Sequence, residues 1–180
     1  MATETKSRKN QTVRDLVLSM LVVGGFVAFL YIIVLRPTPD PVRVVDVAAP
    51  AAVARSANAF PVLVPADVPS GWRATSARYE PGRTPGTGSW FNGYITPDNG
   101  FVAVAQTDHD VDDFVDEQTR KGRKVGSVTI DGQTWDEYES TSGADTKRAL
   151  VLSTPEVTTV VSGTVSFDAL VDFAQRLRTT

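Results

Sequence analysis

The sequence predicts an α+β protein: an N-terminal transmembrane helix followed by one external domain, mainly an antiparallel sheet packed by two helices. Three observations support this class. Residues 16–35 form an apolar run without a charged side chain. From Trp72 onward, short runs of β-branched and aromatic residues recur between turn residues. Two later segments, 110–122 and 166–178, carry apolar residues at helical spacing.

The apolar run LVLSMLVVGGFVAFLYIIVL is long enough to cross a bilayer, since about 20 helical residues span roughly 30 Å. It is longer than the ~7 to 15 apolar residues of a signal peptide core. Leu35-Arg36-Pro37 follows it, without a small-x-small cleavage site. We therefore expect an uncleaved anchor that contacts the lipid bilayer through residues 16–35. The chain has no cysteine, which excludes a lipid anchor attached to one.

The basic residues around this run predict its orientation, because Lys and Arg resist translocation. Four precede it and two follow it closely: Lys6, Arg8, Lys9 and Arg14, then Arg36 and Arg43. Residues 1–15 are therefore expected in the cytoplasm and residues 36–180 outside the plasma membrane. Gly24 and Ala28 form a small-xxx-small pair that would allow homodimerisation, although glycine is common in spans anyway.

The charge balance argues against two classes of partner. The chain holds 18 Lys+Arg and 21 Asp+Glu, a formal net charge of −3, and the acidic excess lies after the apolar run. Nucleic acids and anionic membrane surfaces are bound chiefly by positive charge. We therefore expect no nucleic acid partner and no electrostatic adsorption of the external domain to lipid.

Composition divides the external part into a stalk and a domain. Residues 36–59 are expected to be a stalk or linker, because RPTPDPVRVVD has three prolines and no helical period. The alanine-rich stretch 48–59 is expected to add a short helix with Pro50 in its first turn. Residues 60–180 are predicted to be the α+β domain, beginning with the proline-interrupted extended segment 60–72.

The strand pattern gives seven expected strands in this domain. They lie near 72–79, 89–96, 101–107, 124–130, 133–140, 147–153 and 157–163. Asp131-Gly132 is typical of a two-residue hairpin turn, and residues 96–100 predict a longer hairpin loop with Gly100 in the left-handed conformation. Strands joined by tight turns favour antiparallel pairing.

Two helices are predicted from caps and spacing. The first begins near Asp110, with Val111, Phe114 and Val115 on its apolar face and Gly122 as its C-cap. The second has Ser166 as N-cap and extends over SFDALVDFAQRLR to residue 178. Its apolar stripe contains Phe167, Leu170, Val171, Ala174 and Leu177.

The sequence contains an acidic cluster around the first helix start: Asp108, Asp110, Asp112, Asp113, Asp116 and Glu117. Its spacing resembles the start of a calcium loop, but Asp113 stands where that loop needs glycine and Thr119 where it needs glutamate. Carboxylates in a first helical turn are favoured by the helix dipole. We therefore expect no metal site.

No motif predicts catalysis or a cofactor. His109 is the single histidine, and no nucleophile motif surrounds any serine. A catalytic carboxylate pair could come from among Asp136, Glu137 and Glu139. Strand alternation, however, places Asp136 on the opposite face of the strand from the other two. We expect no enzymatic activity, no catalytic residue and no cofactor.

Aromatic residues on the predicted strands suggest one candidate site. Trp90, Tyr94, Trp135 and Tyr138 would line a groove for an apolar or carbohydrate ligand. The alternative is a purely structural role, since large aromatic residues on strands usually pack in the core.

Several landmarks together resemble a known family. They are the basic tail, the span, RPTPDPVRVVD, FPVLVPADVPSGWR, WFNGYITP, IDGQTWDEY and TTVVSGTVSFDALVDFAQRLR. From Thr12 to Leu177 the chain resembles the actinobacterial membrane family called domain of unknown function 4245, whose activity is unassigned. The last segment is also similar to the end of sensor domains on bacterial anti-sigma factors. The fifteen residues before the span are too short for a cytoplasmic sigma-binding domain.

These features predict a membrane-anchored envelope protein whose external domain docks a protein or another envelope component without enzymatic activity. A small-ligand binding or sensor domain is the second hypothesis, and an envelope hydrolase is the third. A formed aromatic pocket would favour the second. Two carboxylates roughly 5 to 9.5 Å apart in a cleft would favour the third.

Overall fold

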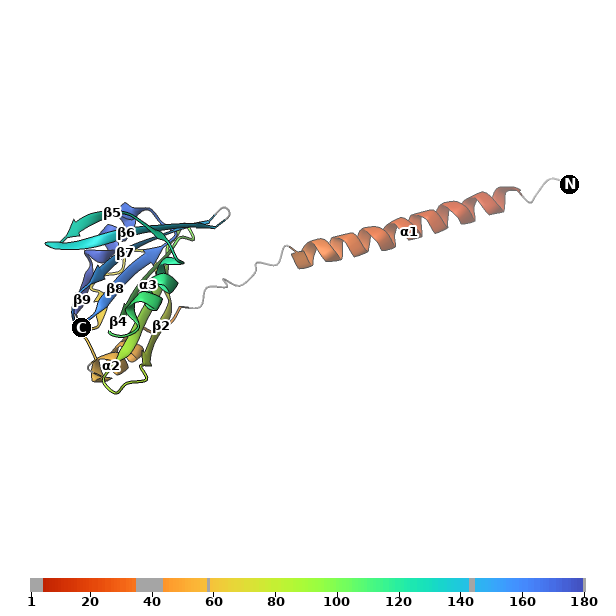
Figure 1. Cartoon of the computed structure of the whole chain (residues 1–180). Coiled ribbons are helices and arrows are strands. Elements are labelled where there is room, and N and C mark those ends of the chain that lie inside the picture. Colours follow the sequence, from red (N-terminus) through yellow and green to blue (C-terminus); the bar gives the residue numbers. More distant parts are fainter. Residues whose placement is uncertain (1–4, 35–43, 58, 143–144, 180) are drawn as a thin grey trace. The chain divides into compact units, whose positions relative to one another are not determined.

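The computed structural model describes residues 5–34, 44–57, 59–142 and 145–179 (Figure 1). The chain divides into two compact units, Met1–Pro41 and Val42–Thr180. The first contains a single described helix. The second contains the sheet and the remaining helices.

The first unit is α1 (Thr5–Val34), a helix of 30 residues. Its segment Arg14–Tyr31 has a mean hydropathy of 1.7, and none of it is buried within the described structure. A helix of this length and composition can cross a membrane, either as an anchor or as a signal sequence.

The second unit is built on a seven-stranded antiparallel sheet with strand order β2-β3-β4-β8-β7-β6-β5. The strands are β2 (Arg73–Pro81), β3 (Gly88–Ile95), β4 (Phe101–Thr107), β5 (Arg123–Ile130), β6 (Gln133–Ser142), β7 (Asp145–Ser153) and β8 (Thr158–Gly163). All seven predicted strands are present, and the predicted α+β class is confirmed. β8 lies between β4 and β7, so the segment from α3 to β7 is inserted between two neighbouring strands.

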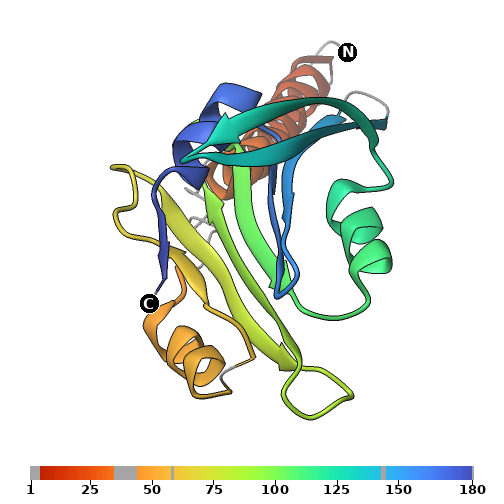
Figure 2. The same cartoon turned by 60° about the vertical axis from the view of Figure 1, so that its left-hand side comes forward.

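Helices cover both faces of this sheet (Figure 2). On the first face, α4 (Phe167–Ala174) buries Leu170 and Phe173 against Val102 and Val161. On the second face, α3 (Val111–Thr119) packs over Val160 and its neighbours. Strand alternation explains this division, because successive residues of one strand point to opposite faces.

A further helix, α2 (Ala48–Ala57), covers the first face where Trp90 lies. Ala51 and Ala54 are buried there, and their small side chains allow the helix to approach the large Trp90 ring closely. The predicted short helix is therefore present, but it packs on the sheet within the compact unit that begins at Val42. The expected stalk over 36–59 and domain start at residue 60 do not match this boundary. Residues 35–43 lie outside the described residues.

Two short strands that the sequence pattern did not predict form a separate antiparallel pair. β1 (Leu63–Pro65) pairs with β9 (Leu177–Thr179), placing Pro65 opposite Leu177. As a result α4 ends at Ala174 instead of residue 178. Leu177 still packs in the core, so its helical spacing reflects burial in a strand that follows the helix.

The turns confirm some predictions and correct others. Asp131 and Gly132 both have positive φ, 49° and 79°, as a type I′ hairpin turn requires. In the 96–100 loop, Asn99 adopts the left-handed conformation with φ 59°, so the prediction for Gly100 is wrong. Asparagine tolerates this region better than most residues.

The helix ends show the same mixture. Ser166 caps α4 as predicted, its hydroxyl accepting from the Ala169 N–H at 3.3 Å. At the end of α3, Arg120 and Lys121 are left-handed instead of Gly122. A Cβ on Gly122 would lie 3.0 Å from the Thr119 carbonyl oxygen. Glycine is therefore favoured there by close backbone approach.

Candidate functional site

The four aromatic residues predicted to line a groove are not brought together. Trp90, Tyr94 and Trp135 are at most 5% exposed on the first face of the sheet. Trp90 packs under α2, whereas Tyr94 and Trp135 belong to the core under α4. Tyr138 lies on the second face near α3, because it is an odd number of residues from Trp135 on the same strand. Core packing thus accounts for three of the four.

The structure instead contains an apolar cleft, here called the α2–Trp72 cleft, of about 490 Å³. Its lining comes from α2, β1, β2 and β3 and from the segments before α2 and between β1 and β2. The lining residues are Val47, Ala48, Ala51, Arg55, Val64, Pro65, Val68, Trp72, Ala74 and Tyr94. The volume falls within the range of small-molecule sites.

Three aromatic rings in mutual contact fix one wall of the cleft. Trp72 lies parallel to Phe173 of α4, with ring centroids 5.8 Å apart and an interplanar angle of 10°. Tyr94 meets Phe173 edge-on at 5.7 Å and Trp72 at 6.5 Å. Because Phe173 is itself buried in the core, the two lining rings are held in place before any ligand arrives.

The Tyr94 hydroxyl has a hydrogen-bond partner within the core. It accepts a hydrogen bond from the Asn92 side-chain nitrogen at 2.8 Å, and both residues are buried. Burial raises the pKa of Tyr94, and the bond from Asn92 opposes this in part. The phenol is therefore neutral at physiological pH. Sequence reasoning missed Asn92, although its place two residues before Tyr94 puts both on one face.

Three backbone N–H groups around the cleft are also paired. Ala48 donates its N–H to Asp46 Oδ1 at 2.9 Å, Ala51 donates to the Val47 carbonyl at 3.0 Å, and Trp72 donates to the Pro69 carbonyl at 3.1 Å. The charged member of the lining is Arg55, which is exposed in the last turn of α2. The cleft is thus an apolar hollow with a cation at its rim.

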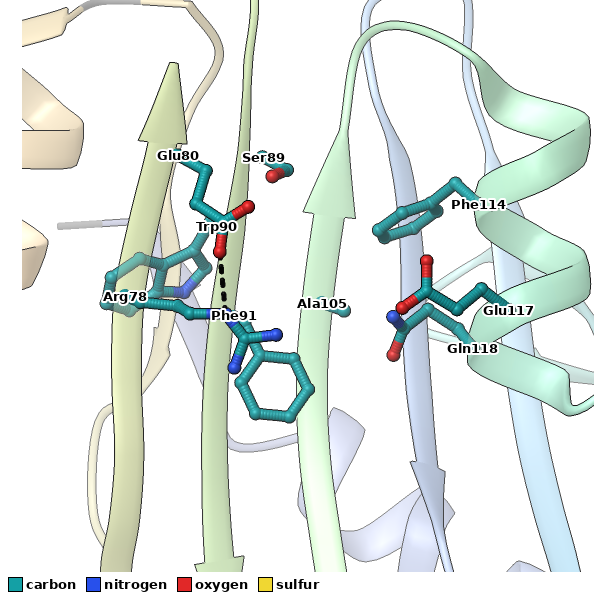
Figure 3. Close-up of a pocket in the computed structure, with 9 residues that line it drawn as sticks. All are labelled: Arg78, Glu80, Ser89, Trp90, Phe91, Ala105, Phe114, Glu117 and Gln118. Carbon is teal, nitrogen blue, oxygen red and sulfur yellow. Dashed lines mark hydrogen bonds and ion pairs between the residues drawn. The ribbon is translucent and has the colours of Figure 1, made fainter. Parts of the chain in front are cut away.

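A smaller hollow lies on the second face between the sheet and α3 (Figure 3). Figure 3 shows Arg78 lying over Phe91, with the guanidinium carbon 4.3 Å from the ring centroid, and Phe114 and Glu117 on α3 beyond. Arg78 Nε also lies 3.0 Å from Glu80 Oε1. This hollow measures about 90 Å³, too small for most ligands.

The acidic helix start serves a structural purpose at Asp108. Its Oδ1 accepts the Gly88 N–H at 2.9 Å, which ties the beginning of β3 to the end of β4. Asp110 has φ 47° and makes no side-chain cap hydrogen bond, so it does not cap α3. Within the described ranges, no three His, Cys, Asp or Glu side chains are grouped to hold a metal.

His109 does not form a catalytic triad with its neighbours. Asp108 Oδ1 and Thr107 Oγ1 lie 3.0 Å and 3.2 Å from the same nitrogen, His109 Nδ1. A triad needs the carboxylate and the nucleophile on opposite ring nitrogens. The Thr107 hydroxyl is also buried and donates to the His109 carbonyl at 3.0 Å.

The carboxylates of β6 are divided between the faces, as strand alternation predicts. Asp136 pairs with Lys124 Nζ at 2.8 Å, whereas Glu139 pairs with Arg148 Nε at 3.2 Å. The register places Asp136 opposite Val151 and Glu137 opposite Leu150, which belong to different cores. Asp136 therefore does not share a face with Glu137 and Glu139, and Glu139 is paired with Arg148.

Lys147 on β7 is a perturbed group that the sequence did not reveal. Its pKa is lowered to about 8, first by burial and second by the nearby positive charge of Arg120, while Glu117 acts in the opposite direction. Both neighbours lie at the end of α3. Its environment depends on the packing of α3 over β7, which no local pattern shows.

The fold and the cleft define an α+β domain with an open apolar hollow, preceded by a helix that is apolar enough to cross a membrane. The chain belongs to the family described as "Protein of unknown function (DUF4245)", whose model matches residues 8–177. The resemblance found in the sequence is therefore confirmed. A comparison with curated proteins gives no match.

Two solved structures are similar to part of the chain. They are titled "Crystal structure of MucB in complex with MucA(peri)" and "The complex structure of Pseudomonas aeruginosa MucA/MucB". Both are 14% identical and align with 65% of this chain, with TM-scores of 0.37 and 0.36. The chain spans about a third of their length, 36% and 34%. Similarity at this level carries no argument about function.

Proposed function

We propose that the protein is a single-pass plasma-membrane protein whose second unit is a non-enzymatic binding domain outside the cytoplasm. Residues 1–15 lie in the cytoplasm, residues 16–35 cross the bilayer, and the domain docks a component of the envelope. The basic residues before the span and the length of α1 support this topology.

The α2–Trp72 cleft is the observation that carries the binding role. Val68 in its lining is 40% exposed, and the exposed Val44 and Val53 lie on or beside α2, whereas the exposed Val111 and Val125 lie elsewhere in the domain. Exposed apolar surface that borders a formed hollow is typical of a binding site. Single apolar residues scattered over a surface, in contrast, are ordinary and do not mark a site.

The rigid wall of the cleft supports recognition as opposed to loose association. Trp72 and Tyr94 are held by Phe173 and Asn92, so their orientation is set without a ligand. Preorganised aromatic surface lowers the entropy cost of binding. This favours a ligand group that inserts between α2 and the Trp72 ring.

A small-ligand binding or sensor domain remains the second hypothesis, and the cleft volume favours it. The hydrolase hypothesis has less support. Glu80 and Glu117 border the hollow beside α3, but Glu80 is paired with Arg78 and the hollow is small.

The test is in-cell crosslinking of the tagged full-length chain, followed by identification of the adducts. Ala48→Phe places a ring in the cleft from an exposed position, and Ala52→Phe places the same ring on an exposed part of α2 outside the lining. We expect Ala48→Phe to remove an adduct that the wild type and Ala52→Phe both retain. Identical adducts in all three proteins would refute docking through this cleft.

A further inference from the structure

The lining of the α2–Trp72 cleft combines an apolar interior with a positive charge at its edge. Nine of its residues are apolar or aromatic side chains, and Arg55 is the cation among them. We propose that the cleft binds the acyl chain of a single-chain anionic amphiphile taken from the membrane. This inference rests on the proposed function and names the chemistry of its ligand.

The size of the cleft suits one hydrocarbon chain. A methylene group needs about as much room as a water molecule in the liquid, ~30 Å³. A hollow of about 490 Å³ therefore accommodates roughly 15 carbon atoms of one chain. A lipid with two chains would have to leave one of them outside.

The hydrogen-bond state of the lining favours a hydrocarbon over a peptide. A bound peptide brings backbone N–H and C=O groups that need partners. The N–H groups of Ala48, Ala51 and Trp72 are already donated within the domain, and the Tyr94 hydroxyl already accepts from Asn92. An alkyl chain requires no such partners and gains from every apolar contact with the lining.

Arg55 supplies charge complementarity for the head group. It is exposed in the last turn of α2, so its guanidinium can meet an anion at the surface while the tail lies inside. Arginine pairs with both carboxylate and phosphate groups. Without an anion the cleft would still accept an alkyl chain, but with lower affinity.

The position of the cleft along the chain also suits a ligand from the membrane. Val47, the first lining residue, follows the end of α1 at Val34 by about 13 residues, which span at most about 45 Å when fully extended. In the proposed topology this segment joins the domain to the membrane, so membrane amphiphiles are ligands that the cleft can meet.

Tryptophan quenching by a brominated fatty acid tests the proposal. The full-length chain is placed in phosphatidylcholine nanodiscs and titrated with 9,10-dibromostearate. The three tryptophans, Trp72, Trp90 and Trp135, all lie outside the apolar helix, and Trp72 lines the cleft. Probe that merely dissolves in the bilayer should therefore leave the fluorescence largely unchanged. We expect saturable quenching that Ala48→Phe abolishes and Ala52→Phe does not.

The head group is tested separately with charge variants. Arg55→Gln should weaken dibromostearate binding two- to five-fold, the range of an exposed ion pair, whereas Arg123→Gln on the edge strand β5 should have no effect. The methyl ester of the probe should bind the wild type and Arg55→Gln equally. If the acid and the ester bind the wild type with equal affinity, the proposal that the ligand has an anionic head group is wrong.

Absence of saturable quenching, or quenching that Ala48→Phe leaves intact, would overturn the acyl-chain proposal. If the in-cell adduct lost in Ala48→Phe is a protein and the probe does not bind, this inference fails while the proposed docking function stands. If Ala48→Phe changes neither adducts nor quenching, both fail.

Discussion

Replacing Leu170 with Ala should strongly destabilise the second compact unit. Leu170 is 0% exposed and packs from α4 against the first face of the sheet, with its Cδ2 3.3 Å from the position a Cβ on Gly163 would occupy. The substitution removes three carbon atoms, worth about 2.4 kcal/mol at 0.8 kcal/mol each. The cavity adds to this, because strands held by neighbours on both sides collapse little. We expect a total loss of about 3 to 4 kcal/mol.

The assay is urea unfolding of a fragment spanning residues 42–180, the compact unit, followed by circular dichroism. This fragment should be soluble and unfold cooperatively. Val53→Ala on α2 is the control, because Val53 is 56% exposed and its truncation should change stability by less than about 0.5 kcal/mol. A loss below about 0.5 kcal/mol for Leu170→Ala would refute the assignment of the buried face of α4.

Three other predictions concern pH, metal and topology. Because burial lowers the pKa of Lys147 to about 8, the native state loses this proton before the unfolded state does, so the free energy of unfolding should rise between pH 8 and about 10. Urea titrations of wild type and Lys147→Met check this, and an equal rise in both would contradict it. Millimolar calcium should leave the melting temperature of the chelator-treated fragment unchanged within about a degree, since saturation a hundredfold above Kd would add about 2.7 kcal/mol. A shift abolished by Asp110→Asn with Asp113→Asn would show a metal site. A C-terminal alkaline phosphatase fusion should be active, and an inactive fusion would reverse the proposed orientation.

Most of the sheet was predictable because strand-forming residues and turn residues act on the backbone conformation of their own segment. Each of the seven strands lies between turn residues, and Asp131-Gly132 specifies its hairpin by backbone conformation alone. β1 and β9 were not predictable in this way. They are three residues each and pair across most of the domain, so tertiary packing decides them.

The site was less accessible from the sequence for a related reason. The α2–Trp72 cleft exists because α2 packs near Trp90 and Trp72 stacks on Phe173, contacts between segments far apart in the chain. The short helix was predicted from its alanine content, but nothing local in the sequence showed that it packs on the sheet instead of belonging to the stalk. The four groove residues were predicted because they are aromatic and lie on strands. Core residues of a sheet are often aromatic strand residues too, so this criterion does not separate a groove from the core.

The account is tested most directly by photo-crosslinking from within the cleft in living cells. A photoreactive amino acid replaces Val68, which lines the cleft, or Thr129, an exposed residue on β5. Binding through the α2–Trp72 cleft predicts a specific adduct from position 68 that disappears when Ala48→Phe is added, and none from position 129. The same adduct from both positions, or an adduct at 68 that survives Ala48→Phe, would contradict the central claim.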